Sequence, residues 1–319
     1  MWWSGPVADR LPLEYDLARK ACQCVGGDTI VRVDGYATYE RCAMYRLYSE
    51  YCPHGDLEDV IKLYKDLGLA MNALGPGIHF NKGIPNRMLW AIFEALSSAL
   101  CILQNGRLPT SPPPPPNTPP YQPIIHHDLK PANIFLSKPH ATFWPGIPIP
   151  KLGDFGLSAP LTSPEAQVPG IGTRGYQAPE QHRYPPESPF RYTTLQDSKT
   201  DIWVVGRIML SLMRLEDERN VHPAPLTGGA IMPRLTALDR PKFPSKMVEL
   251  VHDCLEAEKG NRPCAEVLWR RIREEVGSFP DQGGLYSDLM PMRMQKGDVE
   301  RERIMCSNPG DIYASFGLE

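Results

Sequence analysis

Residues 124–136 read IIHHDLKPANIFL, in which apolar residues flank two histidines and three further polar side chains. Asp128, Lys130 and Asn133 supply a carboxylate, an ammonium and an amide within one short loop. A second carboxylate, Asp154, follows in the sequence KLGDFG, two residues before a glycine. Carboxylate and amide oxygens are hard ligands that suit Mg²⁺, an ion that keeps some of its waters and bridges phosphates. The two stretches together therefore predict a magnesium-dependent phosphate site.

The rest of the chain surrounds these loops with helices and short strands. Apolar spacing and stop signals predict helices at 13–24, 56–67, 86–104, 199–215, 246–258 and 264–276. β-Branched and aromatic residues predict strands at 29–37 and 41–52, and a short strand leads into LGDFG. We expect loops at 69–85 and 138–148, and extended polyproline II structure in the proline-rich segment 107–123.

The composition is that of a soluble globular protein and argues against several functions. Hydrophobic residues make up 42% of the 319 residues and charged residues 22%, an ordinary balance for a folded chain. The net charge of −3 gives no field that would attract nucleic acid or an anionic membrane, so we expect neither as a partner. The eight cysteines form no paired C-x-x-C pattern, which argues against a zinc site. With no signal peptide and no apolar run of membrane-spanning length, we expect an intracellular location, cytoplasmic or nuclear.

Further motifs follow the two polar loops in a fixed order. The stretch GTRGYQAPE at 172–180 contains the motif APE, and KTDIWVVGRIMLSLMRL at 199–215 places Asp-x-Trp on an apolar helix. Together with HHDLKPAN and LGDFG, these motifs resemble the protein kinase family from about residue 13 to about residue 276. The lysine of D-L-K-P-x-N and the threonine of GTRGY resemble the serine/threonine branch of eukaryotic-type protein kinases.

The resemblance implies a role for each polar residue of the two loops. Asp128 would be the catalytic base that accepts the proton of the substrate hydroxyl, and Lys130 would neutralise the transferring phosphoryl group. Asn133 and Asp154 would hold Mg²⁺ on the phosphates of ATP. Thr173 would lie near Asp128 and Lys130. The expected cofactors are thus ATP and Mg²⁺, and the expected partner is a protein substrate with a serine or threonine hydroxyl.

A second group of residues resembles the structural supports of the family. His126 matches the histidine of the catalytic loop, and Phe155 matches the aromatic residue that stacks beneath it. Asp201 matches the buried aspartate that holds the backbone of the catalytic loop. Glu180 and Arg262 resemble a buried ion pair that joins the APE motif to the late helices; the alternative is a surface cap and a separate helix-end charge.

The nucleotide is expected where the second strand meets the next helix. Glu50, Tyr51 and Cys52 resemble the hinge, whose backbone would bond adenine. Asp56 falls where the family contacts ribose. Ser49 occupies the gatekeeper position, and its small side chain would leave the pocket behind adenine open. The expected nucleotide-binding set is Ser49, Glu50, Cys52, Asp56 and Phe135.

The resemblance also implies the architecture, an α+β, bilobal protein-kinase-like fold with a truncated N-lobe sheet and a mainly helical C-lobe. The expected units are a partial N-lobe of one helix and two strands at 1–49, a hinge at 50–55, a C-lobe at 56–280 with the proline-rich insertion 107–123, and a C-terminal tail at 281–319.

The N-terminal part departs from the family pattern. No glycine-rich loop and no V-A-I-K strand precede the helix at 13–24, and the first lysine of the chain, Lys20, lies inside that helix. Glu14 matches the helix glutamate that would pair with the strand lysine, but that lysine has no position to occupy. We therefore expect the polypeptide alone to bind ATP weakly and to transfer phosphate poorly, because positioning and electrostatic stabilisation carry this chemistry.

His127 is a second departure, because kinases usually have arginine at this place. That arginine receives a phosphate on the activation segment, whereas an imidazole is at most partly charged at neutral pH. We expect activity to depend little on phosphorylation of that segment, in which Ser158, Thr162 and Ser163 are candidate sites.

Three functions remain open from the sequence. The first is a serine/threonine protein kinase of which this chain is a fragment, favoured because all four polar residues of the two loops are retained. The second is a catalytically impaired, pseudokinase-like scaffold or binding module. Its prolines at 107–123 would contact an SH3-like or WW-like domain, although a solvated spacer is the simpler interpretation of that segment. The third is a phosphotransferase of another class, which the APE and Asp-x-Trp motifs disfavour.

Overall fold

The computed structural model describes most of the chain between residues 11 and 277. The described residues are 11–39, 44–73, 83–140, 143–182, 195–217, 235 and 240–277. The expected tail at 281–319 and residues 41–43 of the expected second strand lie outside them.

Six α-helices are the main elements of the described structure. They are α1 (Leu13–Cys22), α2 (Leu57–Ala73), α3 (Asn86–Asn105), α4 (Ser198–Arg214), α5 (Ser245–Cys254) and α6 (Ala265–Val276). Short 3-10 turns lie between them at η2 (Gly27–Thr29), η4 (Pro131–Asn133), η5 (Pro164–Gln167), η6 (Pro179–Gln181), η7 (Arg240–Lys242) and η8 (Lys259–Asn261). The loop expected from residue 69 is wrong for 69–73, because leucine, alanine and methionine in this stretch continue α2.

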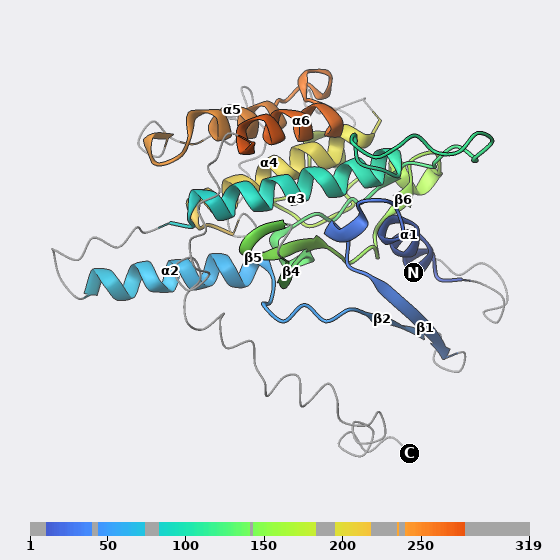
Figure 1. Cartoon of the computed structure of the whole chain (residues 1–319), viewed down its shortest axis with the longest axis horizontal. Coiled ribbons are helices and arrows are strands. Elements are labelled where there is room, and N and C mark those ends of the chain that lie inside the picture. Colours follow the sequence, from blue (N-terminus) through green and yellow to red (C-terminus); the bar gives the residue numbers. More distant parts are fainter. Residues whose placement is uncertain are drawn as a thin grey trace, which may run out of the picture.

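Helix α3 is the centre of the hydrophobic core. Its residues from Met88 to Leu103 are buried, and it contacts α4, α6 and β5. By length and composition α3 could cross a membrane, but 89% of its apolar window is buried inside the protein, so we interpret it as a core helix. Figure 1 shows α3 running across the middle of the molecule, with α4, α5 and α6 on one side and the β4–β5 hairpin on the other.

Gly106 ends α3 in the left-handed conformation, with a φ of 66°, and its N–H bonds the carbonyl of Ile102 at 2.8 Å. A Cβ at this position would lie 2.4 Å from the ring of Tyr121. The helix end and the proline-rich segment are therefore packed together here.

The described residues also form three two-stranded antiparallel sheets. The strands are β1 (Val33–Tyr39), β2 (Met44–Ser49), β3 (Ile124–Ile125), β4 (Ile134–His140), β5 (Phe143–Leu152) and β6 (Ala159–Pro160). They pair as β1 with β2, β3 with β6 and β4 with β5. The loop expected at 138–148 is wrong, because β4 and β5 occupy most of it. Pro139 pairs with Pro148 beside shifts in register, and such irregular positions tolerate residues that lack an N–H.

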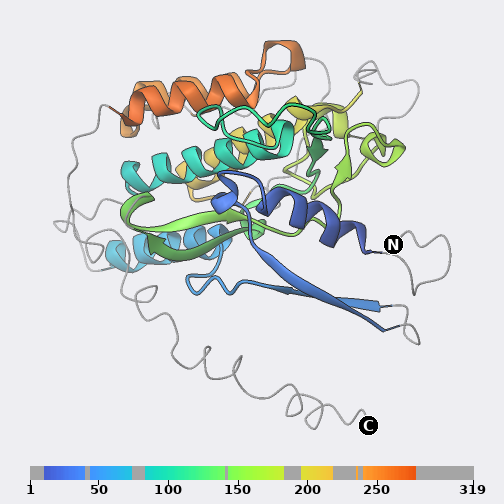
Figure 2. The same cartoon turned by 45° about the vertical axis from the view of Figure 1, so that its right-hand side comes forward.

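The β1–β2 hairpin extends away from the helical layers (Figure 2), whereas α1 places Leu17, Ala18 and Ala21 in the main hydrophobic core. Helix α1 packs on β1. Beyond β2, the chain passes through residues 50–56 into α2. The expected α+β fold, with a small N-terminal sheet and a mainly helical C-terminal part, is confirmed.

The proline-rich segment is exposed from residue 112 to residue 120. A single extended run was expected here, but the structure has a turn in which Thr118 N–H bonds the carbonyl of Pro115 at 3.1 Å. Asn117 allows this turn, with a φ of 68°, because asparagine tolerates the left-handed region better than most residues.

Candidate active site

One buried carboxylate, that of Asp201, holds the backbone of residues 126–133, which we call the catalytic loop. Asp201 in α4 accepts the backbone N–H of His126 at 2.8 Å and that of His127 at 3.3 Å. Burial raises the pKa of Asp201, while the nearby histidines and these two donors favour its charged form and act against the rise. The bonds fix the backbone immediately before Asp128, as the resemblance implied.

Asp128 stands in a closed triangle of polar side chains. The Thr173 hydroxyl donates to Oδ1 of Asp128 at 2.6 Å, and the Lys130 ammonium donates to Oδ2, also at 2.6 Å. Lys130 also donates to the Thr173 hydroxyl at 3.0 Å. The base candidate, the ammonium and the hydroxyl therefore meet at one point, although the chain separates them by up to 45 positions.

Asn133 is fixed by its amide nitrogen. Its Nδ2 donates to the carbonyl oxygen of Asp128 at 2.8 Å and to Oδ2 of Asp128 at 3.3 Å. Both bonds use the nitrogen, so the amide oxygen is left to serve as a ligand.

The turn that carries Asp154 lies directly beside this loop. The backbone N–H of Gly153 bonds the carbonyl of Asn133 at 3.0 Å, and Nε2 of His126 bonds the carbonyl of Gly153 at 3.1 Å. Asp154 has a φ of 58° and an exposed side chain. The rings of His126 and Phe155 contact each other edge to face, with their centroids 5.1 Å apart. The two turns thus share one site.

The surroundings of His126 favour its neutral form. Burial lowers its pKa, and the carboxylates of Asp201, Asp128 and Asp154 only partly oppose that effect. Because Nε2 faces a carbonyl oxygen, which can only accept, Nε2 carries the proton.

Glu14 reaches the same site from α1. The hydroxyl of Tyr45 in β2 donates to Oε2 of Glu14 at 2.5 Å. The pKa of Glu14 is raised, chiefly by burial and further by the charge of Asp154, while the Tyr45 bond acts in the opposite direction. Glu14 therefore faces the Asp154 turn, and its described hydrogen-bond partner is a phenol rather than an ammonium.

The hinge carries a charged pair at its beginning. Glu50 accepts the ammonium of Lys151 at 2.7 Å and the backbone N–H of Arg32 at 2.8 Å. Cys52 follows, and burial together with the Glu50 charge raises its pKa to about 11. Ser49 lies at the exposed end of β2.

Asp56 begins α2 rather than standing free. Its Oδ1 accepts the backbone N–H of Glu58 at 2.8 Å and that of Asp59 at 3.0 Å, the geometry of a helix N-cap. A contact with ribose would therefore have to use its other oxygen.

Phe135 forms a side of the expected nucleotide site. It follows the catalytic loop in β4, and its backbone bridges to Asp56. A Cβ added to Gly153 would lie 2.9 Å from the Phe135 ring and 3.0 Å from Val31. Gly153 thus lets the aromatic ring lie close to the turn that bears Asp154.

A buried ion pair joins the APE motif to the turn before α6. The guanidinium of Arg262 donates to Glu180 through two nitrogens, at 2.7 and 3.0 Å. The side chains are 0% and 1% exposed. The structure therefore shows the pair that the resemblance implied, and not the surface alternative.

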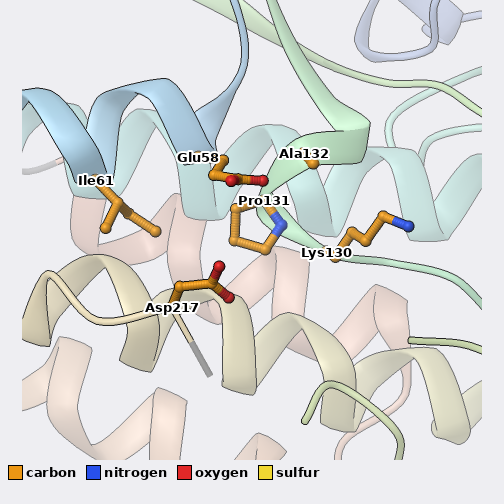
Figure 3. A pocket seen from close by; sticks show the side chains of 6 residues that line it. All are labelled: Glu58, Ile61, Lys130, Pro131, Ala132 and Asp217. Atoms are coloured by element: carbon orange, nitrogen blue, oxygen red, sulfur yellow. The ribbon is translucent and has the colours of Figure 1, made fainter. Parts of the chain in front are cut away.

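A hollow lies between α2, the catalytic loop and Asp217. The hollow is lined by residues of α2, of the catalytic loop and of the segment that follows α4. These residues are Glu58, Ile61, Lys130, Pro131, Ala132 and Asp217. Figure 3 shows the carboxylate of Asp217 directed toward Pro131, while the amine of Lys130 points away. Glu58 forms an ion pair with Lys62 at 2.8 Å.

Several contacts at this site were not predicted from the sequence. Tyr45 was missed, although its inward place in the alternating pattern of β2 was a usable signal. Gln181 donates to the carbonyl of His127 at 3.1 Å, and Gly172 lies against the same carbonyl with a φ of 93°. Gly172 was visible in GTRGY, but no local pattern indicated its contact.

The oxygen donors fit magnesium together with phosphate. Among the described residues, no group of three or more His, Cys, Asp or Glu side chains could hold a metal by itself. The free amide oxygen of Asn133 and the exposed carboxylate of Asp154 supply two hard ligands. Two protein ligands suit Mg²⁺, which takes its other ligands from phosphate and water.

Comparison with known proteins gives the same assignment. A family model of the protein kinase domain matches residues 121–271. The G2-specific protein kinase fin1 of Schizosaccharomyces pombe is 28% identical over 253 residues, which cover 76% of this chain and 30% of fin1. The G2-specific protein kinase nimA of Emericella nidulans is 29% identical over 246 residues, which cover 72% of this chain and 31% of nimA.

Serine/threonine-protein kinase Nek9 of Mus musculus is 27% identical over 222 residues, which cover 69% of this chain and 18% of Nek9. The chain thus spans less than a third of the length of each of these relatives. The family match includes the loop with Asp128, the turn with Asp154 and the Glu180–Arg262 pair. Residues 121–271 thus match the protein kinase domain, and the chain is similar to eukaryotic serine/threonine protein kinases.

Proposed function

We propose that this chain transfers the γ-phosphate of ATP to a serine or threonine hydroxyl of a protein. The observation that carries the proposal is the triangle of Asp128, Lys130 and Thr173, which is joined to the Asp154 turn by the bond from Gly153 to Asn133. A base, a cation and two metal-ligand candidates thereby surround one point.

The residues of the triangle act on the substrate hydroxyl. Asp128 accepts its proton, and the substrate hydroxyl takes the place of the Thr173 hydroxyl or of the Lys130 ammonium at the carboxylate. Lys130, once released from Asp128, places its positive charge beside the transferring group. The bonds of the triangle hold Asp128 in one orientation before substrate arrives, which lowers the cost of positioning it.

Asn133 and Asp154 are the residues that would hold Mg²⁺. When bound, the ion would bridge the phosphates and neutralise the charge that develops on them. Asn133 keeps its oxygen available because its nitrogen is tied to Asp128. Glu50 and Cys52 would present their backbone to adenine, with Ser49 behind it, Asp56 at the ribose and Phe135 along the side.

The unit boundaries stay part of this proposal. Residues 1–49 would be the N-terminal part, 50–55 the hinge and 56–280 the C-terminal lobe. We place the activity inside the cell, in the cytoplasm or nucleus.

A phosphate-transfer assay tests the proposal. The chain is incubated with radiolabelled ATP, Mg²⁺ and a mixture of protein substrates, beside the variants Asp128→Asn and Asp154→Ala. Each variant should lose activity by about 10²-fold or more, because general-base catalysis and metal-ion binding are removed. Asp66→Ala, an exposed change on α2, is the matched control and should keep full activity. Equal incorporation by the wild type and Asp154→Ala would refute the assignment.

A binding module without turnover is the second candidate. It is supported by the bond between Glu14 and the Tyr45 phenol, because this carboxylate otherwise orients a cation that holds the phosphates. The exposed prolines at 112–116 would then contact an SH3-like or WW-like partner. Calorimetry with ATP and Mg²⁺ separates the two functions. Weak binding without incorporation of label favours the module, and incorporation that Asp154→Ala abolishes favours the kinase.

A further inference from the structure

His127 connects the catalytic loop to the activation segment, residues 154–180, through both nitrogens of its ring. Nδ1 lies 3.0 Å from the carbonyl oxygen of Leu157, and Nε2 lies 3.2 Å from that of Ala166. The residue is 2% exposed. The ring therefore spans two places in the segment that are nine positions apart and holds them to the loop.

The chemistry of these contacts sets the charge of the ring. A carbonyl oxygen only accepts hydrogen bonds, and a neutral imidazole has one N–H to donate. In a neutral ring the second nitrogen would direct a lone pair at a carbonyl oxygen, and the contact would be repulsive. Both contacts are favourable only when both nitrogens carry a proton. We propose that His127 is a positively charged positioning residue that clamps the activation segment onto the catalytic loop without a phosphate.

The groups around the ring are compatible with a positive charge. From α4, the carboxylate of Asp201 accepts the backbone N–H of His127 at 3.3 Å. On the loop itself, Asp128 is the next residue, and the surroundings of the preceding His126 favour its neutral form. From the activation segment, Glu165 precedes the carbonyl of Ala166. The hydrogen bonds of His127 described in the structure include no lysine or arginine.

The backbone of His127 holds the far end of the same segment. Its carbonyl oxygen accepts Nε2 of Gln181 at 3.1 Å, and a Cβ on Gly172 would lie only 2.4 Å from it. Thr173 follows Gly172, so the clamp also sets the hydroxyl that bonds Asp128. The inference deepens the proposed kinase function in this respect, but the ring contacts themselves do not depend on turnover.

Loss of the proton should loosen the segment. Once the ring has lost one proton, one of the two contacts with carbonyl oxygens turns repulsive. A charge-assisted hydrogen bond inside a protein is worth about a tenfold or larger change in an opening equilibrium. We expect residues 157–168 to exchange their amide hydrogens about tenfold faster at about pH 9 than at about pH 6, after correction for intrinsic exchange.

Two measurements on the full chain test the clamp. In ¹⁵N-histidine NMR spectra at about pH 6, both ring nitrogens of His127 should be protonated, because each contacts a carbonyl oxygen that can only accept a hydrogen bond. A single protonated nitrogen at this pH would overturn the proposal whether or not the chain is an active kinase. This measurement uses the wild type and does not depend on a variant folding.

Hydrogen exchange of variants gives the second measurement. His127→Arg keeps a permanent charge with several donors, so its segment should stay protected at both pH values. His127→Gln donates from a single nitrogen, so its segment should exchange faster at about pH 6 and lose the pH dependence. His140→Gln, at an exposed position of β4, is the matched control and should behave as the wild type. Phosphatase treatment should leave the wild-type segment equally protected. A pH dependence that survives in His127→Gln, or protection that phosphatase removes, would contradict the clamp.

Discussion

Removal of one partner of the Glu180–Arg262 ion pair should be one of the most destabilising single substitutions in the described structure. The two side chains are 1% and 0% exposed, and two short bonds of 2.7 and 3.0 Å join them. Arg262→Ala would leave the Glu180 carboxylate buried without a cation. Removal of one partner of such a pair costs about 3–5 kcal/mol of unfolding free energy.

The remaining contacts of Arg262 add to this cost. The guanidinium also donates to three backbone carbonyls, those of Glu256 at 2.8 Å, Lys199 at 3.1 Å and Ala257 at 3.2 Å. These carbonyls belong to the segment between α5 and α6 and to the start of α4. Arg262→Ala would leave these three buried carbonyl oxygens without their donor. We therefore expect a loss of unfolding free energy in the upper half of the range, about 4–5 kcal/mol.

Urea unfolding followed by far-UV circular dichroism measures the effect. A loss of this size should lower the midpoint by about 1–2 M urea. The double variant Glu180→Leu with Arg262→Met should recover part of the loss, because an apolar pair leaves no buried charge, although the three carbonyls stay without their donor. Arg270→Ala, which breaks an exposed pair with Glu266, is the control and should cost between zero and about 1 kcal/mol. A loss below about 1 kcal/mol for Arg262→Ala, or strictly additive effects in the double variant, would refute the reasoning.

Two further predictions concern the hinge and the activation segment. Burial and a nearby carboxylate raise the pKa of Cys52 to about 11. At pH 8 its thiol should therefore react with iodoacetamide about a hundredfold more slowly than an ordinary thiol. The reaction should become faster as the pH approaches 11. Site-resolved mass spectrometry, with the exposed Cys264 as internal reference, measures this, and equal rates at pH 8 would contradict it. Gly172→Ala should lower the unfolding free energy by at least about 2 kcal/mol, because its φ of 93° disfavours a side chain and the new Cβ would meet the carbonyl of His127 at 2.4 Å. Gly260→Ala is the control, because a Cβ at this position would meet nothing within 4 Å, and it should lower the unfolding free energy by less than about 1 kcal/mol in thermal or urea melts. Similar losses for the two variants would show that the close approach of Gly172 to the His127 carbonyl does not determine stability.

The sequence predicted the parts of the site in which chemistry and local motif coincide. Asp128, Lys130 and Asn133 lie in one short loop, and Asp154 stands in a strand-turn pattern, so their neighbours in the chain already indicate their surroundings. The long helices were also predicted, because the apolar spacing of α3 and α4 repeats over many residues. These features depend on contacts within a few positions of each residue.

The parts that could not be predicted depend on contacts between distant residues. Tyr45 and Glu14 are 31 positions apart, and the His127 ring reaches carbonyls 30 and 39 positions away. Backbone carbonyls occur at every residue, so no sequence pattern marks the two that the ring contacts. The extended β4–β5 hairpin was missed for another reason, since prolines at Pro139 and Pro148 argue against strands until the irregular register that accommodates them is known.

The two halves of the candidate site are not equally prepared for catalysis. On the catalytic-loop side, the carboxylates of Asp128 and Asp201 are each bonded by donors from the chain. On the side of α1, Glu14 and Asp154 are near enough for their charges to repel, and burial raises the pKa of Glu14 further, while the phenol of Tyr45 supplies one neutral donor. A cation placed between these two carboxylates would remove the repulsion and favour the charged form of Glu14. In the proposed reaction, the chain's own residues would therefore orient the substrate side, whereas the phosphate side would need additional positive charge before both halves could act together.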